Sequence, residues 1–467
     1  MRQRIRGRAT ARHIRGRRMD PVANLRDEWN QLHKAVARGS IKDTLAVLAT
    51  ESVDIDQGGG PGGLTPLMIA VSKGWAHIVE ALLKRGANPS LADKYGVTAL
   101  HLGALERNVT IVKMLTNAGA DLEVVMGSDG LTALHVATGD DNPEAVRALI
   151  EAGANPDSQT PSGVTVGMGF LSLRAVTPLH VAAEKGRTGA LRELLRAKAN
   201  PAASAISTMG PLPYGTTAVP LDLAACGGHS DVVRELVEEV GIEGCDATNA
   251  GEQALHLAAL SQHMDVMTIL TRAGVRDAMG RILFGAAGLG REASVQFLLR
   301  QRRKESEMSV HAYTNSCDGS GMTPLLCSID WCSSGSPRIV RLLVDAGADT
   351  TSTVRVTNLN GGVEYNDTPL AVTTSFLREK VVDGKPATEE QLHRLQAIRR
   401  LLLRIDAVHA VSWLWPSDAP SIVHAAERSC GPEPRMPPLS LTLPILNRRV
   451  KTRHVFVASL MRHSVKP

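Results

Sequence analysis

The sequence predicts an all-α solenoid of about ten stacked helix-turn-helix repeats, joined by β-turn or hairpin fingers of which several are elongated. Three observations support this prediction. A Thr-Pro-Leu type of opening recurs along the chain, a closing Gly-Ala-Asn or Gly-Ala-Asp follows it, and the apolar residues between them have helical spacing. Because such an array buries its apolar faces only by stacking units, its length sets the number of repeats rather than the number of globular domains.

The unit is clearest between residues 64 and 96. Thr65-Pro66 is a helix start, since the Thr hydroxyl can accept a backbone N–H and proline at the first helical position lacks a donor that would have no partner. Gly74 ends this helix, and apolar residues at helical spacing predict a second helix that Gly86 ends. Turn residues then lead to Gly96 and to the next opening, so we expect an extended finger between repeats.

Openings of this kind recur at a nearly constant period. We place them near positions 30, 65, 98, 132, 177, 219, 253, 281, 323 and 368. The closing motif recurs at Gly86, Gly119, Gly153 and Gly347. The unit resembles the ankyrin repeat, whose period is about 33 residues and whose signature is T-P-L-H-x-A. The resemblance covers roughly Trp29 to Leu403 and implies an array with its helices in antiparallel pairs.

Five histidines occupy the same position of the repeat, namely His33, His101, His135, His180 and His256. Copies that lie one repeat apart cannot converge on a single metal ion or substrate. The resemblance to ankyrin repeats implies a structural role for all five, in which each histidine ties its repeat to the next by hydrogen bonds.

Charge divides the chain into three segments. Residues 1–18 hold eight arginines and no acid, and the C-terminal residues are also basic, so residues 19–430 carry about −9 of a total net charge of +5. We predict a basic, disordered arm over 1–28, a repeat array over 29–415 and a Pro-rich, basic, disordered tail over 416–467. The first 18 residues fit a targeting peptide, a nucleic-acid or nuclear-import arm, or a translated leader before Met19, and we favour the leader.

Four fingers are longer than the repeat requires. The extra residues lie roughly at 157–176, 201–217, 304–321 and 350–366, all after the second helix of their repeat. We therefore expect them along one edge, which is the leading candidate for a binding surface. The step from 253 to 281 is short and predicts a repeat without a finger, where the array bends or weakens. In the last repeat an interruption at 378–389 precedes an amphipathic helix over Glu390 to Leu403.

Aromatic residues in the predicted fingers are the candidate partner contacts. They are Tyr95, Phe170, Tyr214, Tyr313 and Tyr365. Tyrosine is enriched at binding hot spots because it offers a large area, a polar group and little side-chain entropy to lose. The alternative is that each ring packs its own loop against the helices. Trp75 lies between its two helices instead, where we expect it to pack on the adjacent repeat.

No arrangement in the sequence indicates catalysis, a metal site or a cofactor. Nucleophile elbows, paired carboxylates and phosphate-binding motifs do not stand out from the repeat pattern. The six cysteines lack C-x-x-C spacing, which argues against a zinc site or a disulfide framework. No stretch approaches the 18 apolar residues of a membrane span, and no secretory signal is recognisable. We expect a monomeric intracellular protein, cytoplasmic or nuclear.

The resemblance implies a non-catalytic scaffold or adaptor that binds protein partners through its finger edge and concave face. Two alternatives stay open. One is a substrate-recognition subunit of a ubiquitin ligase, although the residues after Ser421-Ile422 do not match the C-terminal box that such proteins carry. The other is association with nucleic acid through the basic ends, which the acidic body opposes.

Overall fold

The structure is a computed structural model of the whole chain, and it describes residues 29–414 apart from short gaps. The gaps are 51–52, 61, 162–165, 169–170, 210–214, 246–250, 278, 304–309, 318–321, 331–335, 352–353, 358–363, 380, 383–384 and 387. The chain forms two compact units, Met1–Arg276 and Asp277–Pro467, which we call unit 1 and unit 2. The division falls at the short repeat step that the sequence shows before residue 281.

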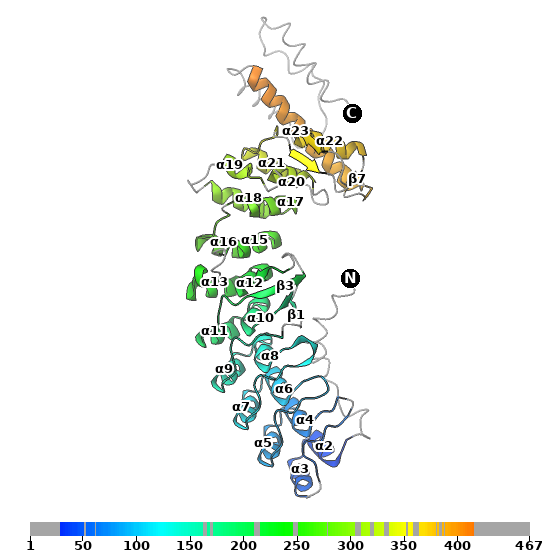
Figure 1. The fold of residues 1–467 in the computed structure, drawn as a ribbon, viewed down its shortest axis with the longest axis vertical. Coiled ribbons are helices and arrows are strands. Elements are labelled where there is room, and N and C mark those ends of the chain that lie inside the picture. Colours follow the sequence, from blue (N-terminus) through cyan, green and yellow to red (C-terminus); the bar gives the residue numbers. More distant parts are fainter. Residues whose placement is uncertain are drawn as a thin grey trace. The chain divides into compact units, whose positions relative to one another are not determined.

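Helices in antiparallel pairs make up both units (Figure 1), which confirms the predicted all-α solenoid of ankyrin-like repeats. In unit 1 the first helices of the pairs are α2 (Gln31–Ala37), α4 (Pro66–Ser72), α6 (Ala99–Leu105), α8 (Ala133–Gly139), α10 (Pro178–Lys185), α12 (Pro220–Gly227) and α15 (Glu252–Ser261). The second helices are α3 (Ile41–Leu48), α5 (Ala76–Lys84), α7 (Val109–Asn117), α9 (Pro143–Glu151), α11 (Thr188–Arg196), α13 (Ser230–Glu239) and α16 (Met264–Arg272). Two short helices, η1 (Gly127–Asp129) and α14 (Ile242–Cys245), lie in fingers.

Unit 2 continues the alternation of first and second helices with more irregular connections. Its first helices are α17 (Arg281–Gly288), α20 (Pro324–Asp330) and α22 (Pro369–Glu379), and its second helices are α18 (Glu292–Arg302), α21 (Pro337–Asp345) and α23 (Glu389–Leu414). A short helix, α19 (Val310–Thr314), occupies the segment where the sequence predicted a long finger. That part of the finger prediction is wrong, since the segment folds into a helical turn.

The first helices begin close to the opening positions predicted from the sequence. In eight of the ten described pairs the first helix begins one residue after the predicted opening position. Helix α15 instead begins at Glu252, before the predicted position 253, and α17 begins at Arg281 itself. Both of these helices follow a glycine with positive φ, Gly251 and Gly280, which has no side chain to cap the helix start.

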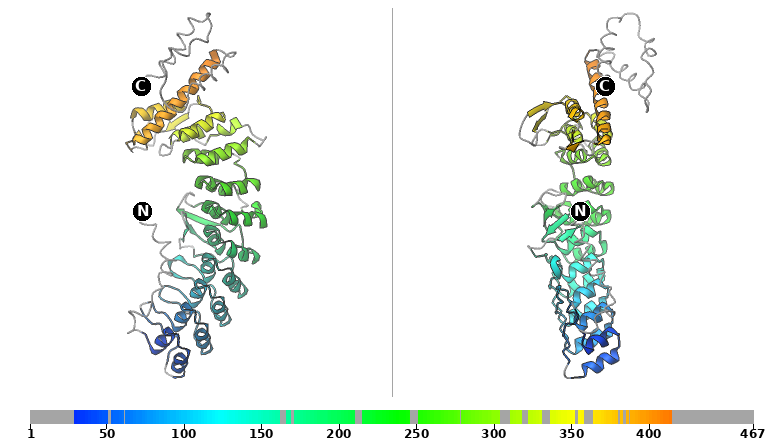
Figure 2. Two further views of the ribbon diagram at one scale, coloured as in Figure 1. Left: turned by 180° about the vertical axis from the view of Figure 1, so that it is seen from behind. Right: turned by 90° about the vertical axis from the view of Figure 1, so that its right-hand side faces the viewer.

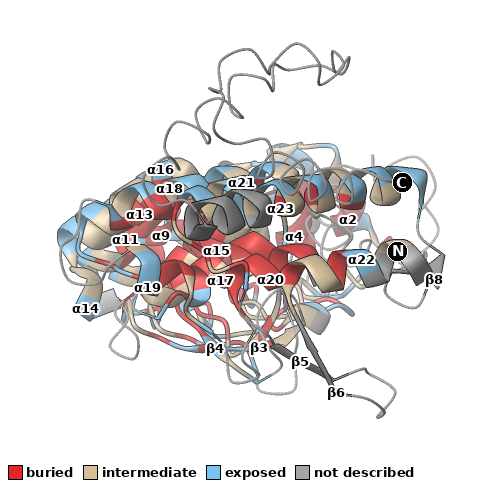
Figure 3. Ribbon diagram, turned by 90° about the horizontal axis from the view of Figure 1, so that it is seen from above, coloured by how far each residue is buried: buried red, intermediate tan, exposed pale blue. Residues whose placement is uncertain are grey.

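The core of each unit consists of the first helices and the inner face of the second helices. In α4 the side chains from Pro66 to Val71 are all buried, and α5 adds Ile78, Val79 and Leu82. First helices pack on first helices of the neighbouring pairs, and second helices on second helices. Figure 3 shows the buried residues concentrated along the first helices. Small aliphatic residues such as Ala70 allow this close stacking.

The fingers of unit 1 all project from the same side of its helix pairs (Figure 2). Two consecutive long fingers form one antiparallel sheet with the order β1 (Val166–Met168), β2 (Leu171–Arg174), β3 (Ala205–Met209) and β4 (Thr217–Ala218). Strands β2 and β3 come from different repeats, and a bulge interrupts their register at Ser172/Leu173. The sequence predicted the long fingers but not that two of them would pair.

Unit 2 contains two separate two-stranded elements. The finger predicted at 350–366 is a hairpin of β5 (Val354–Thr357) and β6 (Glu364–Asp367). The interruption predicted at 378–389 contains the pair β7 (Val381–Val382) and β8 (Lys385–Pro386). Helix α23 then runs to Leu414, eleven residues beyond the predicted end at Leu403, and its first half packs through the buried Leu395, Ile398 and Leu402.

Candidate protein-binding surface

The repeated histidine is held at the start of the first helix. In α6 the N-cap Thr98 donates its backbone N–H to Nδ1 of His101 at 3.2 Å, and the Thr98 hydroxyl lies 2.9 Å from the same nitrogen. Because Nδ1 accepts this hydrogen bond, it carries no proton, and in the neutral ring the other nitrogen carries one. That nitrogen, Nε2, donates to the carbonyl oxygen of Leu131 in the next finger at 3.1 Å. The histidine thus caps its own helix and binds the following repeat.

The same geometry recurs in the neighbouring repeats. His135 Nε2 donates to the Val176 oxygen at 3.0 Å and His180 Nε2 donates to the Ala218 oxygen at 3.1 Å. In the first repeat Asn30 replaces the threonine, and His33 Nε2 lies 3.0 Å from the Leu64 oxygen. These bonds between repeats match the structural role that the resemblance implied for His33, His101, His135 and His180.

Burial sets the protonation state of these rings. It lowers the pKa of His101, His135 and His180 from the usual value to about 4, while the bond to the next repeat's carbonyl opposes that effect. At neutral pH the three rings are therefore uncharged. Each has both nitrogens engaged, so none is available as an acid, a base or a metal ligand.

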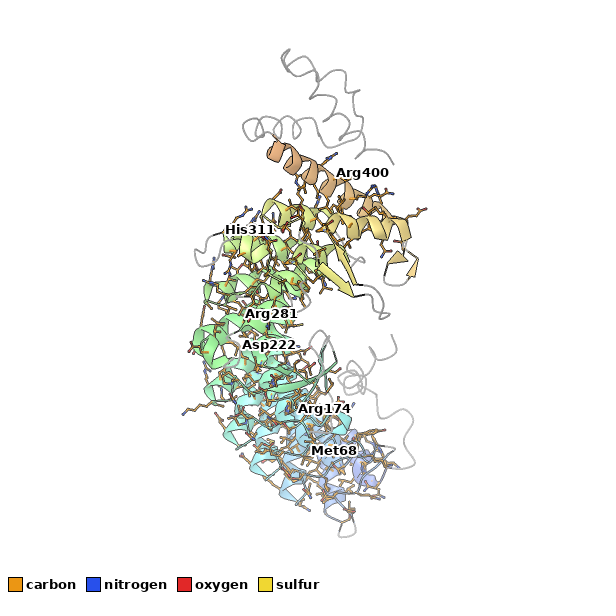
Figure 4. All side chains as sticks on the ribbon, turned by 45° about the horizontal axis from the view of Figure 1, so that its top comes forward. Met68, Arg174, Asp222, Arg281, His311 and Arg400 are labelled. Atoms are coloured by element: carbon orange, nitrogen blue, oxygen red, sulfur yellow. The ribbon has the colours of Figure 1, made fainter. Side chains whose placement is uncertain are left out.

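One pair of repeats replaces the histidine with a different polar contact. Asp222 stands at the histidine position of α12 and is buried (Figure 4). Its Oδ2 accepts the backbone N–H of Val219 at 3.0 Å and the side-chain amide of Gln253, from the next repeat, at 2.7 Å. Gln253 also donates to the Thr217 oxygen. His256 is half-buried in α15, and its role as a tie to the neighbouring repeat stays a prediction.

A second set of contacts links the turns between the two helices in several repeats, and of these only the contact of Trp75 was predicted from the sequence. His229 and His263 are the N-cap residues of α13 and α16, and their Nε2 atoms donate to Glu184 and Cys226 carbonyl oxygens of the preceding repeats. The ring of Trp75 packs against Gly39, as predicted for this residue, where an added side chain would collide with it. All three residues immediately precede a second helix, and this shared position is the signal that could have found them.

The fingers are joined by a ladder of side-chain to backbone bonds. An acceptor in one finger takes the backbone N–H of the Asn or Asp in the next finger's closing motif. The bonds are Asp56 to Asn88, Ser90 to Asp121, Glu123 to Asn155 and Asp157 to Asn200, with distances of 2.8 to 3.0 Å. Ala202 occupies the next acceptor position and has no side-chain oxygen, so this ladder ends there. Consecutive fingers from 54 to 200 are thus fixed side by side.

Comparison with known proteins agrees with this geometry. A model of ankyrin repeats, described as three copies, matches residues 32–126 and 123–205. Residues 32–205 match ankyrin repeats. A 92-residue segment is 40% identical to Inversin of Danio rerio, covering 20% of this chain and 9% of that protein. A 96-residue segment is 32% identical to Palmitoyltransferase AKR1 of Lachancea kluyveri, covering 20% of this chain and 13% of that protein.

A shorter match of 51 residues is 47% identical to the Nuclear factor NF-kappa-B p105 subunit of Gallus gallus, covering 11% of this chain and 5% of that protein. The matched segments thus span about an eighth or less of each of these relatives.

The finger ends of the ankyrin array present one rigid aromatic side chain. Tyr95 is 47% exposed and belongs to a turn in which Asp93 Oδ1 accepts the N–H groups of Tyr95 and Val97 at 2.8 and 2.9 Å. The Tyr95 carbonyl accepts the N–H of Gly127 in the next finger at 2.6 Å. Val125 of that finger is 40% exposed. Tyr95 and Val125 therefore lie on adjacent fingers that are bonded to each other.

The finger sheet exposes a second, smaller surface. Its register places Arg174, Ile206 and Thr217 in one cross-strand row on β2, β3 and β4. Ile206 is 44% exposed, whereas Leu173, Ala205 and Ser207 on the opposite face are fully buried against the array. Figure 4 labels Arg174 on this sheet. One face of the sheet is thus structural and the other is open.

Of the other aromatic candidates, Tyr313 is buried and the rest lie outside the residues whose side chains are described. Tyr313 lies in α19 and is only 2% exposed, and its hydroxyl donates to Asp277 Oδ2 at 2.7 Å. The prediction that Tyr313 lies on an exposed finger is therefore wrong, because the ring fills the core of unit 2. Tyr365 lies in β6, but its side chain, like Phe170 and Tyr214 as a whole, is outside the described residues.

The described residues also bear on two other functional classes, metal-binding and membrane-spanning proteins. Among residues 29–414, with the gaps noted above, no group of three or more His, Cys, Asp or Glu side chains is arranged to hold a metal ion. Within the same part of the chain, every helix is too short or too polar to cross a membrane.

Proposed function

We propose that the chain is a non-catalytic scaffold or adaptor that binds protein partners through the finger edge and the concave face of its ankyrin array. Ankyrin repeats in general mediate protein–protein interaction, and the bonded fingers of unit 1 form a preordered surface for it. Tyr95 carries the proposal: a large aromatic side chain is half exposed on a turn whose backbone is fixed by Asp93 and by the adjacent finger. A rigid loop loses little entropy when a partner binds.

The cellular compartment is part of the proposal. Cys226 and Cys317 are free thiols in the described structure. Unpaired cysteines are typical of proteins that fold in a reducing environment. We therefore place the scaffold inside the cell, in the cytoplasm or the nucleus.

Replacing Tyr95 by Ala tests the proposal. Because Asp93 receives its bonds from backbone N–H groups, the turn keeps its hydrogen bonds in the variant. A hot-spot aromatic contributes about 2 kcal/mol, so we expect a partner to bind roughly 30-fold more weakly. The measurement is quantitative co-purification from native lysate, followed by titration of the partner recovered.

Leu45 provides the matched control. It is 43% exposed on α3, away from the fingers, so Leu45→Ala removes a comparable exposed apolar side chain. The control variant should retain the partners of the unmodified chain. If Tyr95→Ala also retains all of them at full affinity, the finger edge around Tyr95 is not the binding surface.

A further inference from the structure

The fingers that surround Tyr95 are strongly acidic. In the described residues of the four finger segments between 53 and 161, six carboxylates are at least partly exposed, against two basic side chains, Arg85 and Lys94. The carboxylates belong to Asp54, Asp56, Asp121, Glu123, Asp129 and Asp157. Where they accept bonds within the ladder, the donors are uncharged backbone N–H groups, so the bonds do not neutralise the charge. An exposed apolar pair, Tyr95 and Val125, lies among them.

Such a surface fits an extended, arginine-rich peptide. A guanidinium group stacks on a tyrosine ring and forms paired hydrogen bonds with a carboxylate, and it does both better than an ammonium group. The carboxylates recur from finger to finger, and stacked helices lie about 10 Å apart. A ligand that crosses several fingers therefore needs positive charges distributed along its length rather than at one point.

The chain carries a segment with this chemistry. Residues 1–18 contain eight arginines and no acid, and the first four arginines alternate with other residues as Arg2, Arg4, Arg6 and Arg8. In an extended conformation alternate side chains point to the same side about 7 Å apart, which would place these four guanidinium groups in one row. Twenty residues lie between Arg8 and Trp29, enough for a reach of up to about 70 Å.

We propose that the arginine-rich segment 2–18, in place of the leader role favoured from the sequence alone, binds in extended form across the acidic fingers of unit 1, with Tyr95 and Val125 at the centre of the contact. This inference rests on the proposed function, since it assigns the segment to the same surface. The segment competes with protein partners for that surface, so it regulates the scaffold. A partner must displace it, or carry a basic segment of its own.

The test uses the full chain and a labelled synthetic peptide of residues 1–18. One variant replaces Arg2, Arg4, Arg6 and Arg8 by Gln, which releases the fingers while the length of the chain stays the same. The peptide should bind this variant at least about tenfold more tightly than the unmodified chain, in which the surface is already occupied. Equal binding to the two chains would overturn the assignment of this segment as the occupant, and would point to a basic segment of another protein.

A second variant locates the site. In the released background we would add Asp54→Asn, Asp121→Asn and Glu123→Gln, which remove three charges but keep an oxygen for each backbone N–H that these side chains accept. The peptide should bind about tenfold more weakly, since each exposed charge pair contributes up to about 1 kcal/mol and several act together. The matched control removes three exposed charges from second helices, through Glu144→Gln, Glu151→Gln and Glu238→Gln, and should change binding little.

Unchanged peptide affinity in the finger variant would overturn the proposed site. If that variant is found by circular dichroism to be destabilised, Tyr95→Ala in the released background replaces it, with the same expected loss and the same contrary outcome. The proposed function is judged separately, because capture of protein partners by the released variant does not depend on whether the arm binds. If the released variant captures protein partners but does not bind the peptide, the proposed scaffold function stands and its regulation by the segment 2–18 is rejected.

Discussion

The buried polar contacts of unit 1 and unit 2 differ in kind. In unit 1 the bond between a histidine and the next repeat's carbonyl occurs again and again, as in His101, His135 and His180. In the described part of unit 2 the first helix α17 starts without this histidine. Asp277 Oδ2 instead accepts the N–H of Leu283 at 3.0 Å and the hydroxyl of Tyr313, whose ring lies under the guanidinium of Arg302.

The difference explains where the family is recognisable. A bond that recurs in each repeat requires the same residues in each repeat, so it produces the motif that the ankyrin model matches between residues 32 and 205. A contact made once, such as Asp277 with Tyr313, leaves a pair of residues 36 positions apart that nothing in the repeat pattern indicates. Unit 2 keeps the helix pairs of the array but holds its first pair in place differently.

Acidification should produce the largest difference in stability between the two units. The pKa of His101, His135 and His180 in the folded chain is about 4, below the value of about 6.5 in an unfolded chain. The unfolded state therefore binds protons first, and stability is lost as pH falls from about 6.5 towards 4. By pH 5 each of these histidines should lower the free energy of unfolding of unit 1 by about 2 kcal/mol. Hydrogen exchange of the helices in each unit, measured from pH 7 to pH 5, checks this.

His135→Gln is the control for this prediction. It removes one of the three titrating rings, so the loss of stability between pH 7 and pH 5 should shrink by about a third. The variant will be less stable at pH 7, but the prediction concerns the slope with pH and not the starting value. An unchanged slope would show that these histidines do not cause the acid sensitivity.

Asp277→Ala should destabilise unit 2 by about 3 kcal/mol. The substitution leaves the buried Tyr313 hydroxyl and the Leu283 N–H without their acceptor. Tyr313→Phe removes the hydroxyl as well as its need for a partner, so it should cost less, about 1 kcal/mol. Urea unfolding followed by hydrogen exchange in α17 measures both. Equal losses in the two variants would mean that the ring, and not the bond, supplies the stability.

The finger sheet allows a comparison of its two faces within unit 1. Leu173 is fully buried and Ile206, on the adjacent strand, is 44% exposed. Leu173→Ala should destabilise the sheet by about 3 kcal/mol, whereas Ile206→Ala should cost less than about 1 kcal/mol. Exchange of the β3 amides reports the sheet directly. Similar protection in the two variants would show that the buried face does not anchor the fingers.

The smallest effect should come from the finger ladder. Ser90→Ala removes the acceptor of the Asp121 N–H and should cost about 0.5 kcal/mol, because both groups are partly exposed to water. Ala202→Asp should change the stability by less than that, because α14 replaces the turn that would donate to the new carboxylate. Thermal unfolding of the two variants, compared with the unmodified chain, measures the difference. Stabilisation by Ala202→Asp would mean that the ladder can extend past this finger.

Much of the fold follows from the sequence because repeats carry local signals. Thr98, Pro66 and Gly86 mark helix starts and ends through hydrogen bonds and φ angles that involve only nearby residues. The repeated histidine likewise makes the same contact with the next repeat at His33, His101, His135 and His180. The end of α23 was missed because it follows no repeat motif, and the predicted amphipathic stripe ends before it.

The candidate surface was only partly predictable. That Tyr95 belongs to a finger follows from the turn residues around it, and its exposure agrees with that position. The segment of Tyr313 reads equally as a loop, and its burial depends on Asp277 and Arg302, which are distant in sequence. The pairing of β2 with β3 has the same cause: two loops some 30 residues apart meet only because the array stacks their repeats.

The sheet shared by two fingers also limits how this array can evolve. Repeat proteins gain and lose whole units readily because each unit contacts only its neighbours. A unit inserted between the repeats that open at 132 and 177 would move β2 and β3 apart by the width of a helix pair, about 10 Å, beyond the roughly 4.8 Å that strands need to pair. These two repeats are therefore expected to be inherited together, while the units before them remain free to duplicate.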